Sequence, residues 1–153
     1  MPGSANMGER DGLLYGTPEV AARVLKDTTT WFVVGLGNNP DRDAYGIARL
    51  LQSRGKRIVP IYPRAEVVHG EQGYATIAEA AAAVGTPDVV DLFVRSSRVD
   101  RLVDDAIAAG AQAVWMQLGV IDEAAAQRAV DAGLEVVMDN CPAIVWRAAS
   151  AAD

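Results

Sequence analysis

Short apolar runs alternate with longer amphipathic stretches along most of the chain. Each apolar run is continuous, which is typical of parallel strands covered by helices on both faces. The runs predict strands at residues 31–35, 58–62, 89–94, 113–116 and 134–138. The amphipathic stretches predict helices at residues 45–54, 77–83, 98–109 and 123–132. The pattern is therefore that of a βα series.

This series predicts one doubly wound sheet. Right-handed helical crossovers between five parallel strands give an α/β, Rossmann-like fold, and we expect the strand order 3-2-1-4-5. Glycines that can cap a helix in the left-handed conformation stand directly before three of the strands, at Gly55, Gly110 and Gly133. No linker rich in Pro, Gly and Ser interrupts the series, so we expect a single domain over residues 13–149.

The first twelve residues follow a different pattern. Residues 1–12 are rich in glycine, polar and charged residues without an apolar period, and we expect a flexible leader there. Thr17, Pro18 and Glu19 then supply an N-cap hydroxyl, a proline at the first helical position and an early carboxylate. A short helix is therefore predicted before the first strand.

Charge and composition narrow the classes of function. The 153 residues carry 14 basic and 20 acidic side chains, a net charge of −6, which argues against a general nucleic-acid binder. A small anionic ligand needs only a few local cations. The chain shows no secretory segment, no long apolar run and a single cysteine, Cys141. We therefore expect a cytoplasmic protein that uses neither a membrane nor disulfide bonds.

The loop after the first predicted strand is the first candidate for ligand binding, because ligands of open parallel sheets bind beyond the carboxyl ends of the strands. Two glycines there let the backbone approach a phosphate, and amide groups at the start of the next helix add donors. A tight turn without a ligand is the alternative. The candidate residues are Gly35, Leu36, Gly37, Asn38, Arg42 and Tyr45.

The loop departs from the NAD fingerprint. Pro40 stands where G-x-G-x-x-G has its third glycine. At the end of the second strand, where an NAD site has an acidic residue, the chain has Tyr62, Pro63 and Arg64. An arginine can bind a ribose phosphate with two hydrogen bonds, which favours coenzyme A (CoA) or NADP as the ligand. In the alternative interpretation Arg64 is a solvated loop residue.

A third loop lies on the same predicted edge, after Val94. Ser97 can cap the helix that begins near Arg98. Arg95 and Ser96 have no such role and can donate to a pyrophosphate or to an amide-bearing arm of the ligand.

Five blocks in order resemble the small stand-alone CoA-binding domain proteins, which are similar to the CoA-binding domain of the succinyl-CoA synthetase alpha subunit. The blocks are VGLGNNPDR at 34–42, VPIYP at 59–63, VVDLFVRSS at 89–97, AVWMQLG at 113–119 and VVMDNCP at 136–142. The resemblance implies that CoA lies across the strand ends. It places phosphates on residues 35–42, the adenosine end against residues 62–64, and the pantetheine arm along residues 95–97 and Gln117.

The chain departs from this family at four positions. Gly37 and Ala44 stand where the family often has serine, Tyr62 replaces a common asparagine and Asn140 a common arginine. Hydroxyl groups that could donate to phosphate are lost, so the departures bear on affinity more than on the location of the site. Tyr62 can stack on adenine or pack against the protein.

Little in the sequence indicates catalysis. His69 stands in a polar stretch and is interpreted as a solvated loop residue. Cys141 is interpreted as a buried thiol, and the electropositive setting that a reactive thiolate would need is not visible in the sequence. Asp91 and Asp139 are given no acid-base role. Trp115 and Trp146 are expected to be core or interface residues. The HExxH, CxxC, GxSxG and Walker patterns do not occur.

The leading hypothesis is therefore a non-catalytic protein that binds CoA or acyl-CoA. The same cation at Arg64 leaves an NADP-dependent oxidoreductase open, although the chain offers no substrate domain. A third hypothesis is a CoA-sensing or subunit-like protein whose association with a protein partner depends on CoA.

Overall fold

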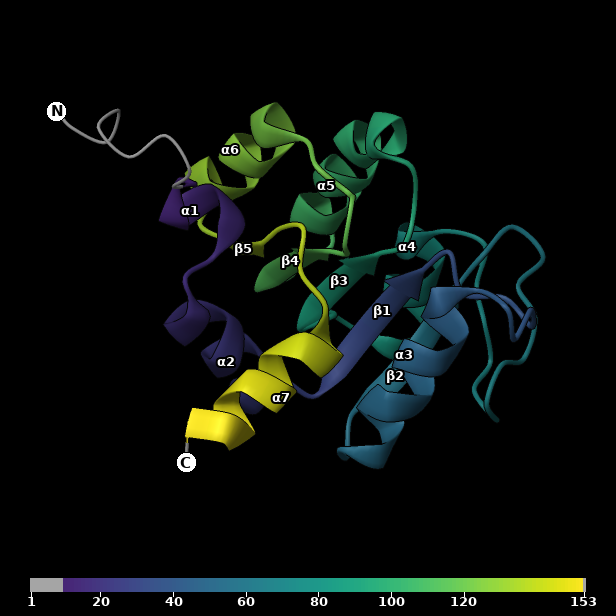
Figure 1. Ribbon diagram of the computed structural model, residues 1–153. Coiled ribbons are helices and arrows are strands. Elements are labelled where there is room, and N and C mark those ends of the chain that lie inside the picture. Colours follow the sequence, from purple (N-terminus) through teal and green to yellow (C-terminus); the bar gives the residue numbers. More distant parts are fainter. Residues whose placement is uncertain (1–9, 153) are drawn as a thin grey trace, which may run out of the picture.

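Five parallel strands form a single sheet in the computed structural model, which describes residues 10–152 (Figure 1). The α/β, Rossmann-like fold predicted from the sequence is confirmed. The strands are β1 (Thr30–Val34), β2 (Arg57–Ile61), β3 (Val89–Leu92), β4 (Ala113–Met116) and β5 (Glu135–Val137).

The order of the strands is β2-β1-β3-β4-β5, so the predicted order 3-2-1-4-5 was wrong in the place of β2 and β3. Pro60 lies within β2, opposite Val33 of β1, and a proline has no N–H to donate to a second neighbouring strand. The outer edge of β2 is covered by Tyr74 instead, whose backbone N–H donates to Pro60 O at 2.9 Å. Proline thus places β2 at the edge of the sheet, and β3 pairs with the other side of β1.

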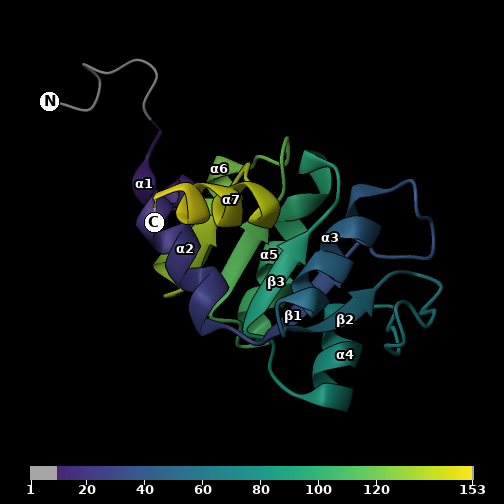
Figure 2. The ribbon, with the colours of Figure 1, turned by 60° about the horizontal axis from the view of Figure 1, so that its bottom comes forward.

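Helices cover both faces of the sheet (Figures 1 and 2). Core clusters on the two faces assign α2, α3 and α7 to one side and α1, α4, α5 and α6 to the other. The helices are α1 (Gly12–Tyr15), α2 (Pro18–Asp27), α3 (Asp43–Ser53), α4 (Ile77–Val84), α5 (Val99–Ala108), α6 (Glu123–Asp131) and α7 (Pro142–Ala152), and a 3-10 turn, η2 (Ser96–Arg98), precedes α5. The sequence predicted neither α1 nor α7.

Two tryptophans anchor the face under α2, α3 and α7. Trp31 and Trp115 are fully buried, with ring centroids 5.6 Å apart. Each indole N–H has an acceptor: Trp31 Nε1 donates to Thr28 Oγ1 at 2.9 Å and Trp115 Nε1 to Asn140 O at 3.0 Å. Because both polar atoms are satisfied, the rings stabilise the core through their apolar area. The core role predicted for Trp115 is confirmed.

The N-terminal caps follow the sequence. Thr17 Oγ1 accepts from Val20 N at 3.2 Å, so the helix predicted at Thr17-Pro18-Glu19 is confirmed as α2. Of the leader expected over residues 1–12, residues 1–9 lie outside the described residues. Asp11 caps α1 by accepting from Leu13 N at 2.8 Å, and Arg10 forms an ion pair with Asp139. Residues 10–12 are thus part of the fold.

Two features are absent from the described residues, 10–152. No helix there has the length and apolar character needed to cross a membrane. No three His, Cys, Asp or Glu side chains within that range group as metal ligands would.

Candidate functional site

The turn between β1 and α3 forms the centre of the candidate site. Gly35 follows β1 with φ +95°, and a Cβ atom there would lie 2.3 Å from the backbone oxygen of Phe93. Only glycine allows this conformation and this approach. The turn therefore lies against the end of β3, at the point where the strand order reverses and ligands of such sheets bind.

A cavity of about 750 Å³ opens at this edge of the sheet. Its walls come from the β1–α3 turn with the first residues of α3, from residues 93–96 after β3, from residues 117–120 after β4, and from Cys141 before α7. We call it the larger cavity. Segments that are far apart in the sequence therefore meet at the carboxyl ends of β1, β3 and β4.

A second cavity, of about 340 Å³, lies beside the first and is called the smaller cavity. It is formed by the β1–α3 turn and the segment after β2, including Tyr62, Arg64 and Glu66. Gly35 and Arg42 belong to the walls of both cavities. The two spaces are thus adjoining parts of one groove that runs along the strand ends.

The segment of residues 62–76, between β2 and α4, forms a flap that closes one side of the smaller cavity. Asn38 Nδ2 donates to Val67 O at 2.9 Å, and Gln52 Nε2 donates to His69 O at 3.1 Å. The His69 ring lies 4.2 Å from that of Tyr45, with Nε2 2.8 Å from the Tyr45 carbonyl oxygen. His69 is half-buried and holds the flap on α3, so its interpretation as a solvated residue was wrong.

Two of the departures from the resembled family are coupled in space. A Cβ atom at Gly37 would lie 3.2 Å from the Tyr62 ring. The ring therefore occupies the space next to Gly37 that a serine side chain would need. Tyr62 is 37% exposed and also lines the smaller cavity. One side of its ring therefore packs against Gly37, and the exposed part of the side chain faces the groove.

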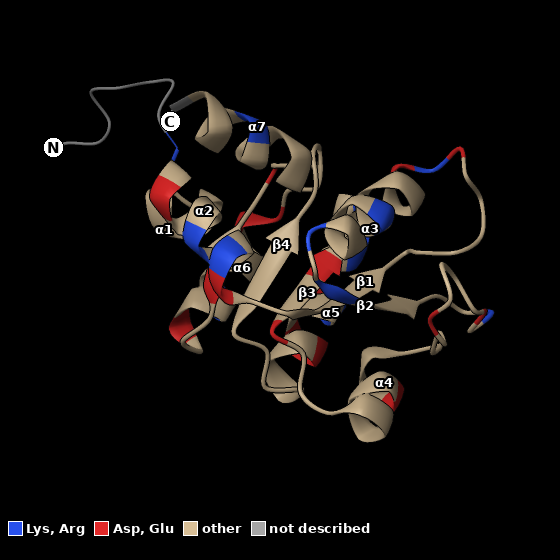
Figure 3. Ribbon diagram, turned by 90° about the horizontal axis from the view of Figure 1, so that it is seen from below, with Lys and Arg blue, Asp and Glu red and all other residues tan. Residues whose placement is uncertain are grey.

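Three arginines give the groove its positive charge. Arg42, Arg64 and Arg95 are exposed, and none of them forms an ion pair with another residue in the range 10–152. Acidic residues accompany them, and basic and acidic positions alternate along the loop before α3 (Figure 3). The arginines are therefore free to bind an anion, with the adjacent carboxylates limiting the net charge of the groove.

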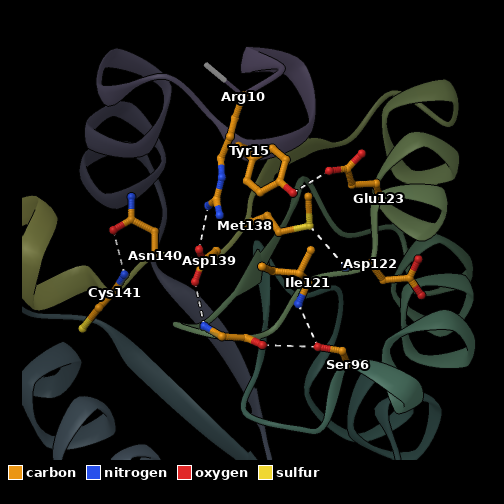
Figure 4. Close-up of polar contacts among 11 residues, drawn as sticks. Arg10, Tyr15, Ser96, Ile121, Asp122, Glu123, Met138, Asp139, Asn140 and Cys141 are labelled. Carbon is orange, nitrogen blue, oxygen red and sulfur yellow. Dashed lines mark hydrogen bonds and ion pairs between the residues drawn. The ribbon is translucent and has the colours of Figure 1, made fainter. Parts of the chain in front are cut away.

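A polar network fixes the far side of the larger cavity (Figure 4). Asp139, with φ +56°, accepts from Gly119 N at 2.6 Å and from Arg10 Nη1 at 2.6 Å. The Gly119 N–H, and next the Arg10 guanidinium, hold the pKa of Asp139 below its usual range. Arg10 also lies 4.4 Å from the centre of the Tyr15 ring. The network ties the N-terminal segment to the loops after β4 and β5.

Ser96 belongs to the same network. Its hydroxyl donates to Gly119 O at 3.2 Å and accepts from Ile121 N at 3.0 Å. Ser96, predicted to have no structural role, thus joins two loops, and the helix cap predicted for Ser97 was wrong. Because a 3-10 turn intervenes, α5 begins at Val99 without a side-chain cap.

The two serines make a matched pair of variants. Ser96→Ala removes both hydrogen bonds that join the loops after β3 and β4, and we expect the free energy of unfolding to fall by about 1 to 2 kcal/mol. Ser97→Ala removes an exposed hydroxyl and should change it by less than about 0.5 kcal/mol. Urea unfolding of both variants measures the difference. Equal effects would contradict the structural role of Ser96.

A buried carboxyl lies beneath the larger cavity. Asp91, in the middle of β3, is fully buried, and its Oδ1 accepts a hydrogen bond from Gln117 Nε2. Burial raises the pKa of Asp91 to about 8, and the Gln117 hydrogen bond opposes part of that rise. Asp139 takes part in other contacts, so the two carboxyls do not pair.

The structure brings most of the candidate residues from the sequence to the groove. Those that line it are Gly35, Gly37, Asn38, Arg42, Tyr62, Arg64, Arg95, Ser96 and Gln117. Four others do not line it. Leu36 is buried in the core, Tyr45 packs against His69, and Pro63 and Ser97 are exposed outside both cavities.

Several wall residues were missed. Phe93, Ile47, Val120 and Leu118 contribute apolar surface, and Cys141, which is half-buried, lies at the wall as well. Apolar residues after a strand or on a helix follow the same sequence pattern as core residues, so no local signal distinguishes these positions. Leu118 could have been predicted from its position between Gln117 and Gly119, because this loop follows the fourth strand and contains the candidate residue Gln117.

Comparison with known proteins identifies the family. Residues 29–147 match the CoA binding domain family. The chain belongs to that family. The match begins just before β1 and ends within α7, so it spans the sheet and the whole groove. The relationship to CoA-binding domains expected from the five sequence blocks is confirmed.

Individual proteins are similar to this chain over most of their length. The uncharacterised protein YneT of Bacillus subtilis is 28% identical over 118 residues, which are 77% of this chain and 85% of YneT. A hypothetical protein from Pyrococcus horikoshii superposes with a TM-score of 0.81 at 28% identity, covering 93% of this chain and 98% of the other. The crystal structure of Prb, the PH1109 protein redesigned for binding, gives 0.78 at 31% identity, with 84% and 89% covered.

A larger enzyme contains a similar fold. The dinucleotide-forming acetyl-coenzyme A synthetase 1 of Ca. Korarchaeum cryptofilum superposes with a TM-score of 0.61 at 24% identity. The match covers 71% of this chain and 25% of the synthetase. At this identity the similarity concerns the fold alone.

Proposed function

We propose that the protein is a non-catalytic holder of CoA or acyl-CoA, with the ligand at the carboxyl edge of the sheet. The observation that carries the proposal is the groove of two adjoining cavities, lined by three arginines without ion pairs to described residues, in a chain of the CoA binding domain family. The smaller cavity, with Arg64 and Tyr62, suits the nucleotide. The larger one suits the amide-bearing arm.

Each part of the groove offers the chemistry that its part of CoA requires. The backbone of the Gly35 turn and the Arg42 side chain lie between the two cavities, where they can bind the pyrophosphate. Arg64 can bind the ribose phosphate with two hydrogen bonds. Arg95, Gln117 and the apolar surface of Phe93 and Leu118 line the space for the pantetheine arm. A protein partner and the cytoplasmic location stay predictions of the sequence, which does not indicate the acyl group.

Calorimetric titration with CoA, dephospho-CoA and NADP tests the proposal. Wild-type protein should bind CoA more tightly than dephospho-CoA, because only CoA carries the ribose phosphate. Arg64→Ala should reduce that difference about tenfold while leaving dephospho-CoA binding nearly unchanged. Arg101→Ala is the matched control, since Arg101 is an exposed arginine on α5 outside both cavities.

The other results identify the alternatives. No binding of CoA by the wild-type protein would refute the proposal. Tight binding of NADP with weak binding of CoA would favour the NADP-dependent oxidoreductase, for which the same arginine supplies the phosphate contact. A protein captured only in the presence of CoA would favour the CoA-sensing role.

A further inference from the structure

The carboxyl group of Asp91 is buried at a cost that the fold alone does not explain. Asp91 lies in the central strand β3, opposite Val33 on β1 and Trp115 on β4. One oxygen, Oδ1, accepts from Gln117 Nε2, and Oδ2 is the buried side-chain oxygen without a hydrogen-bond partner among the described residues. A buried polar atom without a partner destabilises a protein. Because the hydrogen-bond partner of Asp91, Gln117, lines the larger cavity, the buried carboxyl group points to a role in that cavity.

Gln117 connects this carboxyl group to the larger cavity. It follows β4, is 5% exposed and lines the larger cavity. Its amide nitrogen is directed to Asp91, so the amide oxygen is left for another partner. No side chain or backbone group in residues 10–152 donates a hydrogen bond to the Gln117 amide oxygen. In that range Asp91 Oδ2 is the buried side-chain atom that lacks a partner, so the Gln117 oxygen is not fully buried. The oxygen is therefore accessible from the cavity.

We propose that Asp91 is a positioning residue that binds the Gln117 amide nitrogen and so turns the Gln117 carbonyl oxygen toward the larger cavity, where it accepts a hydrogen bond from a secondary amide of the ligand. This inference rests on the CoA-binding function proposed above, since the pantetheine arm carries two such amides. Asp91 itself does not touch the ligand. It acts through the orientation and polarity of Gln117.

Ionisation of Asp91 changes the strength of this arrangement. A carboxylate accepts a stronger hydrogen bond than a neutral carboxyl group, and the polarised amide becomes a better acceptor at its own oxygen. The other titratable groups around this site are Asp41, Arg42, Asp43, Arg95 and Cys141, which line the larger cavity, and Tyr45 of α3, which packs against the core on that face, while α2 adds apolar side chains. The causes of the raised pKa of Asp91 are burial and the opposing Gln117 bond, with no charged group among them. Ligand affinity should therefore rise as pH increases through the pKa of Asp91.

Two ligands separate the amide arm from the phosphates. Desulfo-CoA has the amide arm without a thiol that would titrate, and adenosine 3′,5′-bisphosphate has no amide arm. Between about pH 6.5 and about pH 9.5 the affinity for desulfo-CoA should rise roughly threefold relative to the bisphosphate. Asp91→Asn keeps an oxygen acceptor for Gln117 but cannot ionise. The ratio of its affinities for desulfo-CoA and the bisphosphate should therefore stay at the low-pH value across this range. Asp27→Asn, an exposed carboxylate outside both cavities, should behave as wild type.

A second measurement does not depend on a stable variant. In the wild-type protein without ligand, the side-chain amide signals of Gln117 in a ¹⁵N NMR spectrum should shift with pH and report the ionisation of Asp91. An amide that does not shift, or an affinity ratio that still depends on pH in Asp91→Asn, would overturn the inference. Failure of the wild-type protein to bind CoA at any pH would instead refute the proposed function, and the NMR titration would still test the contact.

Discussion

Wild-type protein should lose about 5 kcal/mol of its free energy of unfolding between pH 4 and pH 8 because of Asp91 alone. The pKa of this carboxyl group is raised from 3.8 to about 8 by burial. Below the lower value both the folded and the unfolded chain hold the proton. Between the two values the unfolded chain releases it and the folded chain keeps it, so rising pH favours unfolding. Above the upper value the loss is complete.

Urea unfolding at a series of pH values measures this loss, and Asp91→Asn isolates it. Asparagine has nearly the same shape and cannot ionise, so the variant should lack this part of the pH dependence and exceed the wild type in stability at high pH. Asp27→Asn should retain the wild-type dependence, because Asp27 is exposed at the end of α2. Parallel curves for wild type and Asp91→Asn would show that Asp91 is ionised without difficulty in the folded protein.

Stability and ligand binding thus place opposite demands on one side chain. Ionised Asp91 destabilises the empty protein and strengthens the hydrogen bond that orients Gln117. A ligand that donates a hydrogen bond to the Gln117 oxygen binds more tightly when Asp91 is ionised. By linkage, binding of such a ligand must lower the pKa of Asp91. Such a buried group is expected where function, and not packing, selects the residue. The sequence marks Asp91 as such a residue, because it is a single carboxylate inside an apolar run. Two valines precede it, and Leu92 and Phe93 follow it.

The local elements were readable in the sequence, whereas the pairing of strands was not. Continuous apolar runs predict parallel strands because both faces of each strand are buried, and this held for all five strands. Periodicity carries no information on which strands become neighbours. Pro60 does carry it, because a proline in a strand indicates an edge, and it would have placed β2 at the edge of the sheet.

The candidate site was predictable to the extent that it depends on strand ends. The carboxyl ends of parallel strands lie at one edge of the sheet in any strand order, so the loops after β1 and β3 were both predicted at that edge. The predicted order would have kept them apart, with β2 between them. Gly35 and Arg95 line one cavity because β3 pairs directly with β1. Contacts between loops distant in sequence were not predictable. His69 on Tyr45, and Ser96 between Gly119 and Ile121, depend on geometry that no local pattern encodes.

Gly35→Ala should lower the free energy of unfolding by about 3 to 5 kcal/mol and remove ligand binding. Two effects destabilise the folded variant. The φ of +95° strains any residue that has a side chain, and the added methyl group would lie 2.3 Å from the Phe93 carbonyl oxygen. The backbone would have to move away from β3, and the wall that both cavities share would move with it.

Gly46→Ala provides the control within the same segment. Gly46 lies in α3, and a Cβ atom there would meet nothing within 4 Å. Alanine favours a helix interior over glycine, so this variant should be stabilised by about 0.5 to 1 kcal/mol. Urea unfolding of the two variants should therefore give changes of opposite sign. Wild-type stability of Gly35→Ala would contradict this account of the groove. It would mean that the β1–α3 turn has room for a methyl group and therefore does not lie against the end of β3.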